Sequence, residues 1–103
     1  MNKIEKLTKL CHVSSGGTPS RGKKEFYGGN ILWAKIGDIE RSNGIIYNTE
    51  EHITKEGLAA IRNRIFPKGT LLFSMYGSVG KTAFTGVDLS TNQAILGIRL
   101  KEE

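Results

Sequence analysis

Cysteine and histidine are scarce in this sequence, and hydrophobic residues never form a long run. The 103 residues contain one cysteine, Cys11, which excludes a disulfide framework, and two histidines, His12 and His52. So few metal-binding side chains argue against a structural zinc site. No apolar stretch approaches the roughly 18 residues of a membrane-spanning helix, and residues 1–10 lack the apolar centre of a signal peptide. These absences predict a cytoplasmic chain without a metal site.

Acidic residues are also in the minority. Ten Asp and Glu stand against fifteen Lys and Arg, which gives a formal net charge of +5. This balance excludes a protein that imitates DNA with acidic side chains, and it favours an anionic partner such as nucleic acid. The length suits one domain and not two, so we expect residues 1–103 to form a single domain around one hydrophobic core.

Two prolines and thirteen glycines divide the chain into short pieces. Glycine clusters are typical of tight turns, and the segments between them are rich in β-branched and aromatic residues. They predict strands over residues 31–36, 45–47, 70–75, 81–85 and 93–100. Two helices are expected, at 4–10 and 55–61. Thr54 would cap the second, with Leu58 and Ile61 facing the core. The predicted fold is α+β and β-rich, with a strongly twisted, mostly antiparallel sheet and one or two short helices.

Residues 77–82, Gly-Ser-Val-Gly-Lys-Thr, resemble the end of a phosphate-binding P-loop. The full pattern needs an earlier glycine where this chain has Met75, and it needs a helix that begins at Lys81. The residues from Lys81 to Gly86 predict a strand closed by a turn instead. We therefore interpret the segment as a glycine-rich hairpin turn that binds no nucleotide.

The acidic residues do not form a recognisable catalytic group. Asp38 and Glu40 are two positions apart and predict a shared solvated face, while Glu50 and Glu51 lie in a polar segment. A general acid or base needs a positioned partner and a shifted pKa, and neither pair has a motif around it. The sequence therefore predicts no catalytic residue.

A series of short blocks spans nearly the whole chain. The blocks are 16–20 (GGTPS), 27–31 (YGGNI), 33–39 (WAKIGDI), 53–58 (ITKEGL), 67–72 (PKGTLL), 74–81 (SMYGSVGK) and 91–95 (TNQAI). Together, in this order and spacing, they resemble the target-recognition domain of type I restriction–modification specificity subunits, usually called S subunits. In that family the domain continues past the last block into a long helical spacer, whereas this chain stops at Glu103. We therefore expect a truncated target-recognition domain without the spacer.

The resemblance implies a non-catalytic subunit that reads one half of a bipartite DNA target. Its implied partners are double-stranded DNA, methyltransferase (M) subunits and motor-nuclease (R) subunits. The M subunits would carry S-adenosylmethionine and the R subunits ATP with magnesium, so this chain would hold no cofactor of its own. Phosphate contacts would supply affinity, and contacts with base edges would supply specificity.

Family members share these blocks but read different DNA sequences, so the shared residues are expected to build the fold. The expected core residues are Trp33, Ile36, Leu71, Phe73, Ile95 and Ile98, and the expected turn glycines are Gly16, Gly17, Gly77 and Gly80. Asn92 and Gln93 are expected to satisfy buried backbone groups.

Base-reading residues are expected between the blocks, because Arg and Asn there can make bidentate contacts with base edges. The candidates are Arg21, Lys23, Lys24, Tyr27, Arg41, Asn43, Arg62 and Arg64. Phosphate contacts are expected from the glycine-rich turn and the start of the first basic loop, through Ser20, Tyr76, Ser78 and Lys81.

An alternative function belongs to another class. A truncated domain would leave a sheet edge unpaired, and unpaired edges promote strand exchange between chains. In this hypothesis the chain is a non-catalytic assembly fragment that associates with itself, or with a second S fragment, through sheet edges and does not bind DNA.

Overall fold

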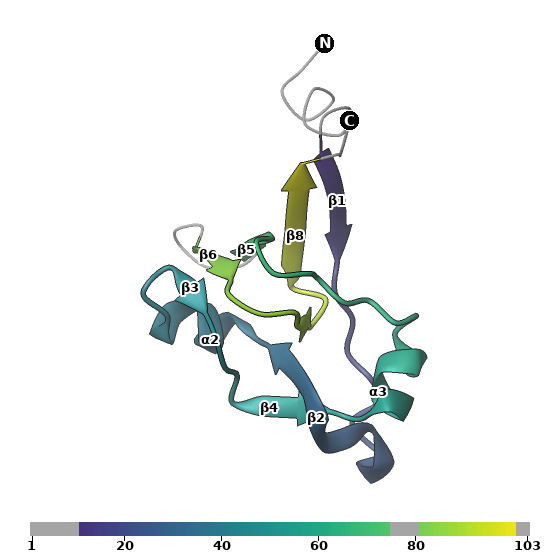
Figure 1. Cartoon of the computed structure of the whole chain (residues 1–103). Helices are drawn as coiled ribbons and strands as arrows, with labels where there is room; N and C mark the ends of the chain where they lie inside the picture. The colour runs from purple at the N-terminus through teal and green to yellow at the C-terminus, as the bar shows by residue number, and fades with distance from the viewer. Residues whose placement is uncertain (1–10, 75–80, 101–103) are drawn as a thin grey trace.

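The computed structural model describes residues 11–74 and 81–100. Eleven short elements follow one another in this part of the chain (Figure 1). In order they are β1 (Cys11–Ser15), the 3-10 helix η1 (Lys24–Phe26), β2 (Tyr27–Ala34), α2 (Ile36–Arg41), β3 (Ile45–Ile46), β4 (Glu51–Ile53), α3 (Lys55–Ala60), β5 (Leu71–Ser74), β6 (Thr82–Thr85), β7 (Ser90–Thr91) and β8 (Ile95–Leu100).

The strands form two small sheets. One has five strands in the order β1-β8-β5-β6-β3, and the other has three in the order β4-β2-β7. The pairs β3–β6 and β2–β7 are parallel, and the other pairs are antiparallel. In Figure 1, β1 and β8 extend as one long pair away from β2, β4 and α3 at the opposite end. The α+β, mostly antiparallel fold is the predicted class, and the helix predicted at 55–61 is α3, while the one predicted at 4–10 lies outside the described residues.

Two hydrophobic clusters fill the interior. The larger one contains Ala34, Ile39, Ile46, Phe66, Leu72, Ala83, Leu89 and Ile95, and the smaller one contains Trp33, Ile53 and Ile61. Phe66 and Leu89 exchange backbone hydrogen bonds of 2.7 and 3.0 Å. The Phe66 ring lies against β8 at Gly97, where an added Cβ would be only 2.3 Å from the ring. Glycine at this position therefore lets the aromatic ring pack directly on the sheet.

One predicted core residue is wrong. Trp33 and Ile95 are buried at 1% and 0% exposure, whereas Phe73 is 37% exposed. Side chains alternate between faces along a strand, and in β5 it is Leu72 that points into the core, at 0% exposure. Phe73 therefore lies on the opposite face. Ile36, Leu71 and Ile98 are only half-buried.

Helix α2 was not predicted from the sequence, which indicated a strand up to residue 36. Lys35 is extended and serves as the N-cap, and its backbone N–H donates to the Asp38 carboxylate at 2.8 Å. This bond satisfies one of the free donors at the helix start. Asp38 is 5% exposed, so it does not share a solvated face with Glu40. The short strands β1, β4 and β7 were also missed.

Helix α3 confirms the predicted cap. The hydroxyl of Thr54 accepts a hydrogen bond from the Gly57 N–H at 3.0 Å, and Ile61 and Leu58 pack into the smaller cluster. Gly57, in the first turn of this helix, has a packing role. A Cβ there would be 2.4 Å from the carbonyl oxygen of Phe26.

Gly16 and Gly17 permit close packing rather than a turn. A Cβ on Gly16 would be 2.0 Å from the Thr91 hydroxyl, and one on Gly17 would be 2.9 Å from Ile61. Gly17 also donates its N–H to the Thr91 carbonyl at 2.9 Å. These contacts join the segment after β1 to β7. Gly77 and Gly80 lie outside the described residues.

Candidate nucleic-acid interface

The loop between β1 and β2 is held by Arg21. Its guanidinium makes two hydrogen bonds to the Glu51 carboxylate, at 2.7 and 3.1 Å. The same group lies over the rings of Tyr27 and Trp33, at 4.7 and 4.9 Å from their centroids. Such a bidentate, stacked arrangement suits the planar guanidinium of arginine and not the compact ammonium of lysine. Arg21, the first candidate base reader, therefore has a role inside the protein.

Glu51 is shared between two cations. Its second oxygen lies 2.7 Å from the Lys35 Nζ, which also contacts Glu50 at 2.8 Å. The hydrogen bonds from Arg21 and then from Lys35 lower the pKa of the Glu51 carboxyl from 4.5 to about 2. In return, the hydrogen bond to Glu51 raises the pKa of Arg21, and those to Glu50 and Glu51 raise the pKa of Lys35. The carboxylate thus stays ionised through the whole physiological pH range.

Tyr27 fixes the same loop from the other side. Its hydroxyl donates to the carbonyl of Pro19 at 2.5 Å, and its ring meets the Trp33 ring edge-on at 5.8 Å. Burial raises the pKa of Tyr27, and the nearby Arg21 charge opposes that rise. Trp33 Nε1 donates to the carbonyl of Gly17 at 3.0 Å. Tyr27 is therefore also part of the fold and not a free side chain on the surface.

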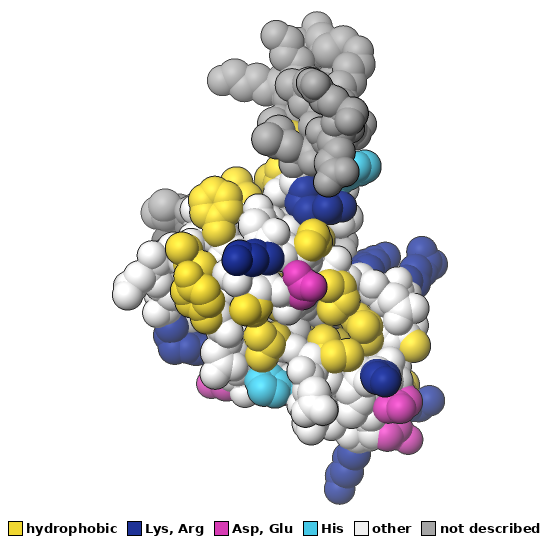
Figure 2. Space-filling model, viewed as in Figure 1, with side chains coloured by type: hydrophobic (Ala, Val, Ile, Leu, Met, Phe, Trp, Pro, Cys, Tyr) yellow, Lys and Arg dark blue, Asp and Glu magenta, His cyan; other side chains and the backbone are white. Residues whose placement is uncertain are grey.

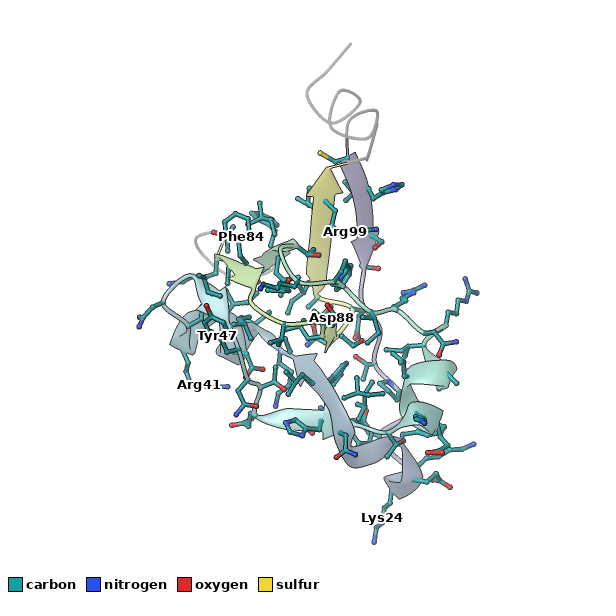
Figure 3. All side chains as sticks on the ribbon, viewed as in Figure 1. Lys24, Arg41, Tyr47, Phe84, Asp88 and Arg99 are labelled. Carbon is teal, nitrogen blue, oxygen red and sulfur yellow. The ribbon has the colours of Figure 1, made fainter. Side chains whose placement is uncertain are left out.

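The remaining residues of this loop face solvent. Ser20, Lys23 and Lys24 are exposed, and the Lys23 ammonium lies 5.5 Å from the centroid of the Phe26 ring. Lys24 extends from η1 at the lower tip of the molecule (Figure 3) and has no side-chain partner among the described residues. These cations are available to a bound phosphate.

The second candidate loop (41–43) and the third (62–64) each contain one side chain that is bonded inside the protein and one that is exposed. Arg41 donates to the buried Asp38 at 2.8 Å, while the neighbouring Asn43 is exposed. Arg64 donates to the carbonyl of Gly16 at 2.9 Å, which ties the segment after α3 to the segment after β1.

The tight turn after α3 presents Arg62. Arg62 and Asn63 have left-handed backbone conformations, with φ of 61° and 53°, and both are exposed. Asparagine adopts this conformation more readily than most residues, which suits Asn63, whereas arginine adopts it rarely. The Arg62 side chain has no hydrogen bond or ion pair among the described residues.

The glycine-rich segment leads into a strand. β6 begins at Thr82 and pairs antiparallel with β5, so no helix starts at Lys81 as a P-loop would require. Lys81 is exposed, and Tyr76 and Ser78 lie outside the described residues. In the described part of the chain, no three His, Cys, Asp or Glu side chains are grouped as a metal site would need. No helix there is long and apolar enough to cross a membrane.

Asn92 and Gln93 differ in their roles. The Asn92 side chain accepts a hydrogen bond from the Ala94 N–H at 3.1 Å, as expected of a residue that satisfies backbone groups. Gln93 is exposed and receives a hydrogen bond from the hydroxyl of Thr18. It therefore joins two surface segments and does not serve a buried backbone group.

Sequence comparison decides the family. Residues 2–103 match the model of the type I restriction modification DNA specificity domain. The chain belongs to this family. The specificity domain is the recognition component of type I systems and is not a catalytic one.

The curated relatives are specificity subunits. The type I restriction enzyme MjaIX specificity subunit of Methanocaldococcus jannaschii is 34% identical over 100 residues, covering 96% of this chain and 23% of the relative. The EcoprrI specificity subunit of Escherichia coli is 31% identical over 97 residues, covering 93% and 24%. The chain thus spans about a quarter of the length of these relatives.

The fold is also that of a solved specificity subunit. The crystal structure of the HsdS subunit from Thermoanaerobacter tengcongensis superposes with a TM-score of 0.68 at 14% identity. The superposition covers 92% of this chain and 22% of the HsdS chain. The two chains therefore share a fold, and the α+β prediction is confirmed.

Glu51 and Lys35 are the residues that sequence reasoning missed. Lys35 lies in the block 33–39, whose residues are expected to build the fold, and Glu51 lies in a polar segment 30 positions from the arginine that it binds. No local pattern signals such a contact, because it depends on the pairing of β2 with β4.

Proposed function

We propose that this chain reads one half of a bipartite DNA target as the specificity component of a type I restriction–modification system. The family match over residues 2–103 carries the proposal. The excess of basic residues supports it, because cations that neutralise phosphates release counterions and provide affinity. Methyltransferase subunits with S-adenosylmethionine and motor-nuclease subunits with ATP and magnesium would be its cytoplasmic partners, and this chain would supply no cofactor.

The side-chain contacts divide the candidate residues into two groups. Arg21, Tyr27, Arg41 and Arg64 are engaged inside the protein. The exposed candidates whose side chains make no hydrogen bond or ion pair among the described residues are Ser20, Lys23, Lys24, Asn43, Arg62 and Lys81. We propose that this second group contacts DNA, with Asn43 and Arg62 suited to base edges and the others to phosphates.

A binding titration on the assembled complex tests this function. The chain would be combined with its methyltransferase subunits, and fluorescence anisotropy would be measured on cognate and scrambled duplexes at several salt concentrations. Removing one cation that binds a phosphate should reduce the slope of log affinity against log salt by about 0.9. Lys24→Ala should therefore weaken binding to both duplexes about equally. Arg62→Ala should cost about 1–3 kcal/mol on the cognate duplex and little on the other.

Arg99 provides the matched control. It is an exposed cation on β8, far from Lys24 in Figure 3, so Arg99→Ala removes the same charge from another part of the surface. For Arg99→Ala, the slope of log affinity against log salt should equal that of the unmodified chain. A complex that binds both duplexes equally well at every salt concentration would contradict the proposal.

A second candidate function rests on an exposed apolar row. Directly opposed residues of neighbouring strands share one face of a sheet, and one such row runs Val13, Ile98, Leu71, Phe84, Ile45 across all five strands. Val13, Ile45 and Phe84 are 39%, 45% and 51% exposed. Figure 2 shows hydrophobic side chains gathered over β3 and β6. Contiguous exposed apolar surface of this kind commonly marks an interaction site.

This row favours self-association through a sheet face and not through a sheet edge. The edge strands β3, β4 and β7 are two or three residues long and offer few unpaired backbone groups, while the edge strand β1 has five residues, of which the exposed Val13 belongs to the apolar row. Light scattering over a concentration series tests the alternative, with Phe84→Ser expected to abolish any dimer and Lys24→Ala to leave it intact. A chain that is monomeric at all concentrations removes this function.

A further inference from the structure

We infer that Glu51 is a positioning residue for DNA recognition, which fixes the loop of residues 18–26 by holding Arg21. The inference rests on the proposed function, because it assigns that loop a place at the DNA surface. Glu51 itself would touch no base or phosphate.

Glu51 occupies one forked edge of the Arg21 guanidinium. A guanidinium presents a forked edge of N–H groups to a carboxylate or to the O6 and N7 atoms of guanine. Arg21 uses two of its N–H groups on Glu51, and its planar surface lies over Tyr27 and Trp33. Turning that fork toward a base would break both carboxylate bonds and leave Glu51 with Lys35 alone.

The middle of the loop has few other attachments. Its start is joined to the body by Thr18, which bonds Gln93, and by the Pro19 carbonyl, which accepts from Tyr27. Its end is joined through the Glu25 carbonyl, which accepts from Thr54 at 2.6 Å. Between these points, the long-range side-chain contacts among the described residues are those of Arg21, whose guanidinium lies over Tyr27 and Trp33 and is held there by Glu51. Breaking the Arg21–Glu51 pair would free the segment that carries Lys23 and Lys24.

The effect should be larger on binding than on stability. Arg21 is 54% exposed along its side chain, and ion pairs that open to solvent contribute little to folding. A freed loop must instead be ordered when DNA binds, and that cost weakens affinity. A positioning role therefore predicts a binding defect without a matching folding defect.

The test compares Glu51→Gln, Arg21→Ala and the double variant in the assembled complex. All three should bind the cognate duplex about tenfold more weakly than the unmodified chain, a factor that corresponds to about 1.4 kcal/mol. The double variant should be no weaker than either single one, because both changes open the same contact. Glu50→Gln is the control: Glu50 is adjacent, its side chain contacts Lys35 and not Arg21, and the variant should bind normally.

A spectroscopic signal reports the contact without DNA. Trp33 is the single tryptophan, and Arg21 lies over its ring, so its fluorescence should change in the same way in Glu51→Gln and Arg21→Ala. A merely structural role would change this fluorescence and leave binding unaffected, and that result would overturn the inference.

The remaining outcomes are distinct. If Arg21 reads a base, Glu51→Gln binds like the unmodified chain while Arg21→Ala loses cognate preference, which also overturns the inference. A complex whose unmodified chain does not discriminate between duplexes overturns the proposed function and the inference together. A discriminating complex in which Glu51→Gln alone fails to weaken binding overturns only the inference.

Discussion

Replacing Gly57 with alanine is a change for which helix propensity and packing predict opposite effects on stability. Alanine is about 1 kcal/mol more favourable than glycine inside a helix, so propensity predicts that Gly57→Ala stabilises α3. In the structure, however, an added Cβ would lie 2.4 Å from the Phe26 carbonyl oxygen and 3.1 Å from its carbon. Both are backbone atoms, which cannot rotate out of the way as the end of a side chain can.

The local hydrogen bonds hold the two backbones together. The Thr54 N–H donates to the same Phe26 carbonyl at 3.0 Å, and the Thr54 hydroxyl donates to the Glu25 carbonyl at 2.6 Å. Relieving the clash would move α3 away from η1 and weaken these bonds. Inserting a methyl group into a packed site costs about 1–3 kcal/mol. Subtracting the gain of about 1 kcal/mol in propensity leaves a range of about 0–2 kcal/mol, and we expect Gly57→Ala to destabilise the chain by roughly 1 kcal/mol.

Urea denaturation followed by circular dichroism measures this difference. A loss of that size should also lower the melting temperature of a domain this long by roughly 4–8 °C per kcal/mol. Gly37→Ala in α2 is the matched control, because its Cβ would approach only the end of the Arg41 side chain, at 3.0 Å. We expect Gly37→Ala to leave stability unchanged or slightly raised. Equal or greater stability of Gly57→Ala would refute the packing argument.

Three further changes test individual contacts. Thr54→Ala should cost about 1 kcal/mol in urea denaturation because it removes the cap on the Gly57 N–H, and Thr54→Ser should restore it. Trp33→Phe should lower the melting temperature, because it leaves the buried Gly17 carbonyl without its donor, at a cost of about 1–3 kcal/mol. The pKa of Glu51 is lowered from 4.5 to about 2, so its contribution to stability is complete above pH 4.5 and is lost as the pH falls toward 2. Glu51→Gln should therefore flatten the pH dependence of stability in that window, as measured by acid titration of the unfolding midpoint.

The sequence predicted the elements whose signals are local. Thr54 lies directly before a run of helix-forming residues, so the cap of α3 could be read from neighbouring positions. Strands β5 and β6 lie within predicted segments that glycine and proline bound, and β8 lies within the predicted segment 93–100, which is rich in Ile and Leu. The face of a strand was harder to predict. In β5 both Leu72 and Phe73 are apolar, and only the packing of the sheet decides which of them is buried.

The missed elements depend on contacts between distant segments. β1 has no run of hydrophobic residues and becomes a strand by pairing along its whole length with β8. Lys35 alone separates the apolar end of β2 from Ile36 at the start of α2, and its bond to Asp38 starts the helix. The hydrogen-bond partners of Arg21 and Arg64 could not be predicted either, because the acceptors lie 30 and 48 positions away in the sequence.

These internal partners change what the basic composition means for DNA binding. Arg21, Lys35 and Arg41 each lie within 3 Å of a carboxylate. Seen from a distant phosphate, the positive charge of each is nearly cancelled by that carboxylate, so these residues serve mainly to hold the loops in place. The long-range field that attracts a phosphate backbone must then come from unpaired cations such as Lys24 and Arg62. Sequence discrimination, in contrast, requires side chains held in one geometry, because a hydrogen bond to a base edge breaks when its donor moves. Under the proposed function, the chain separates the two tasks: paired cations fix the loops, and unpaired cations on those loops would contact the DNA.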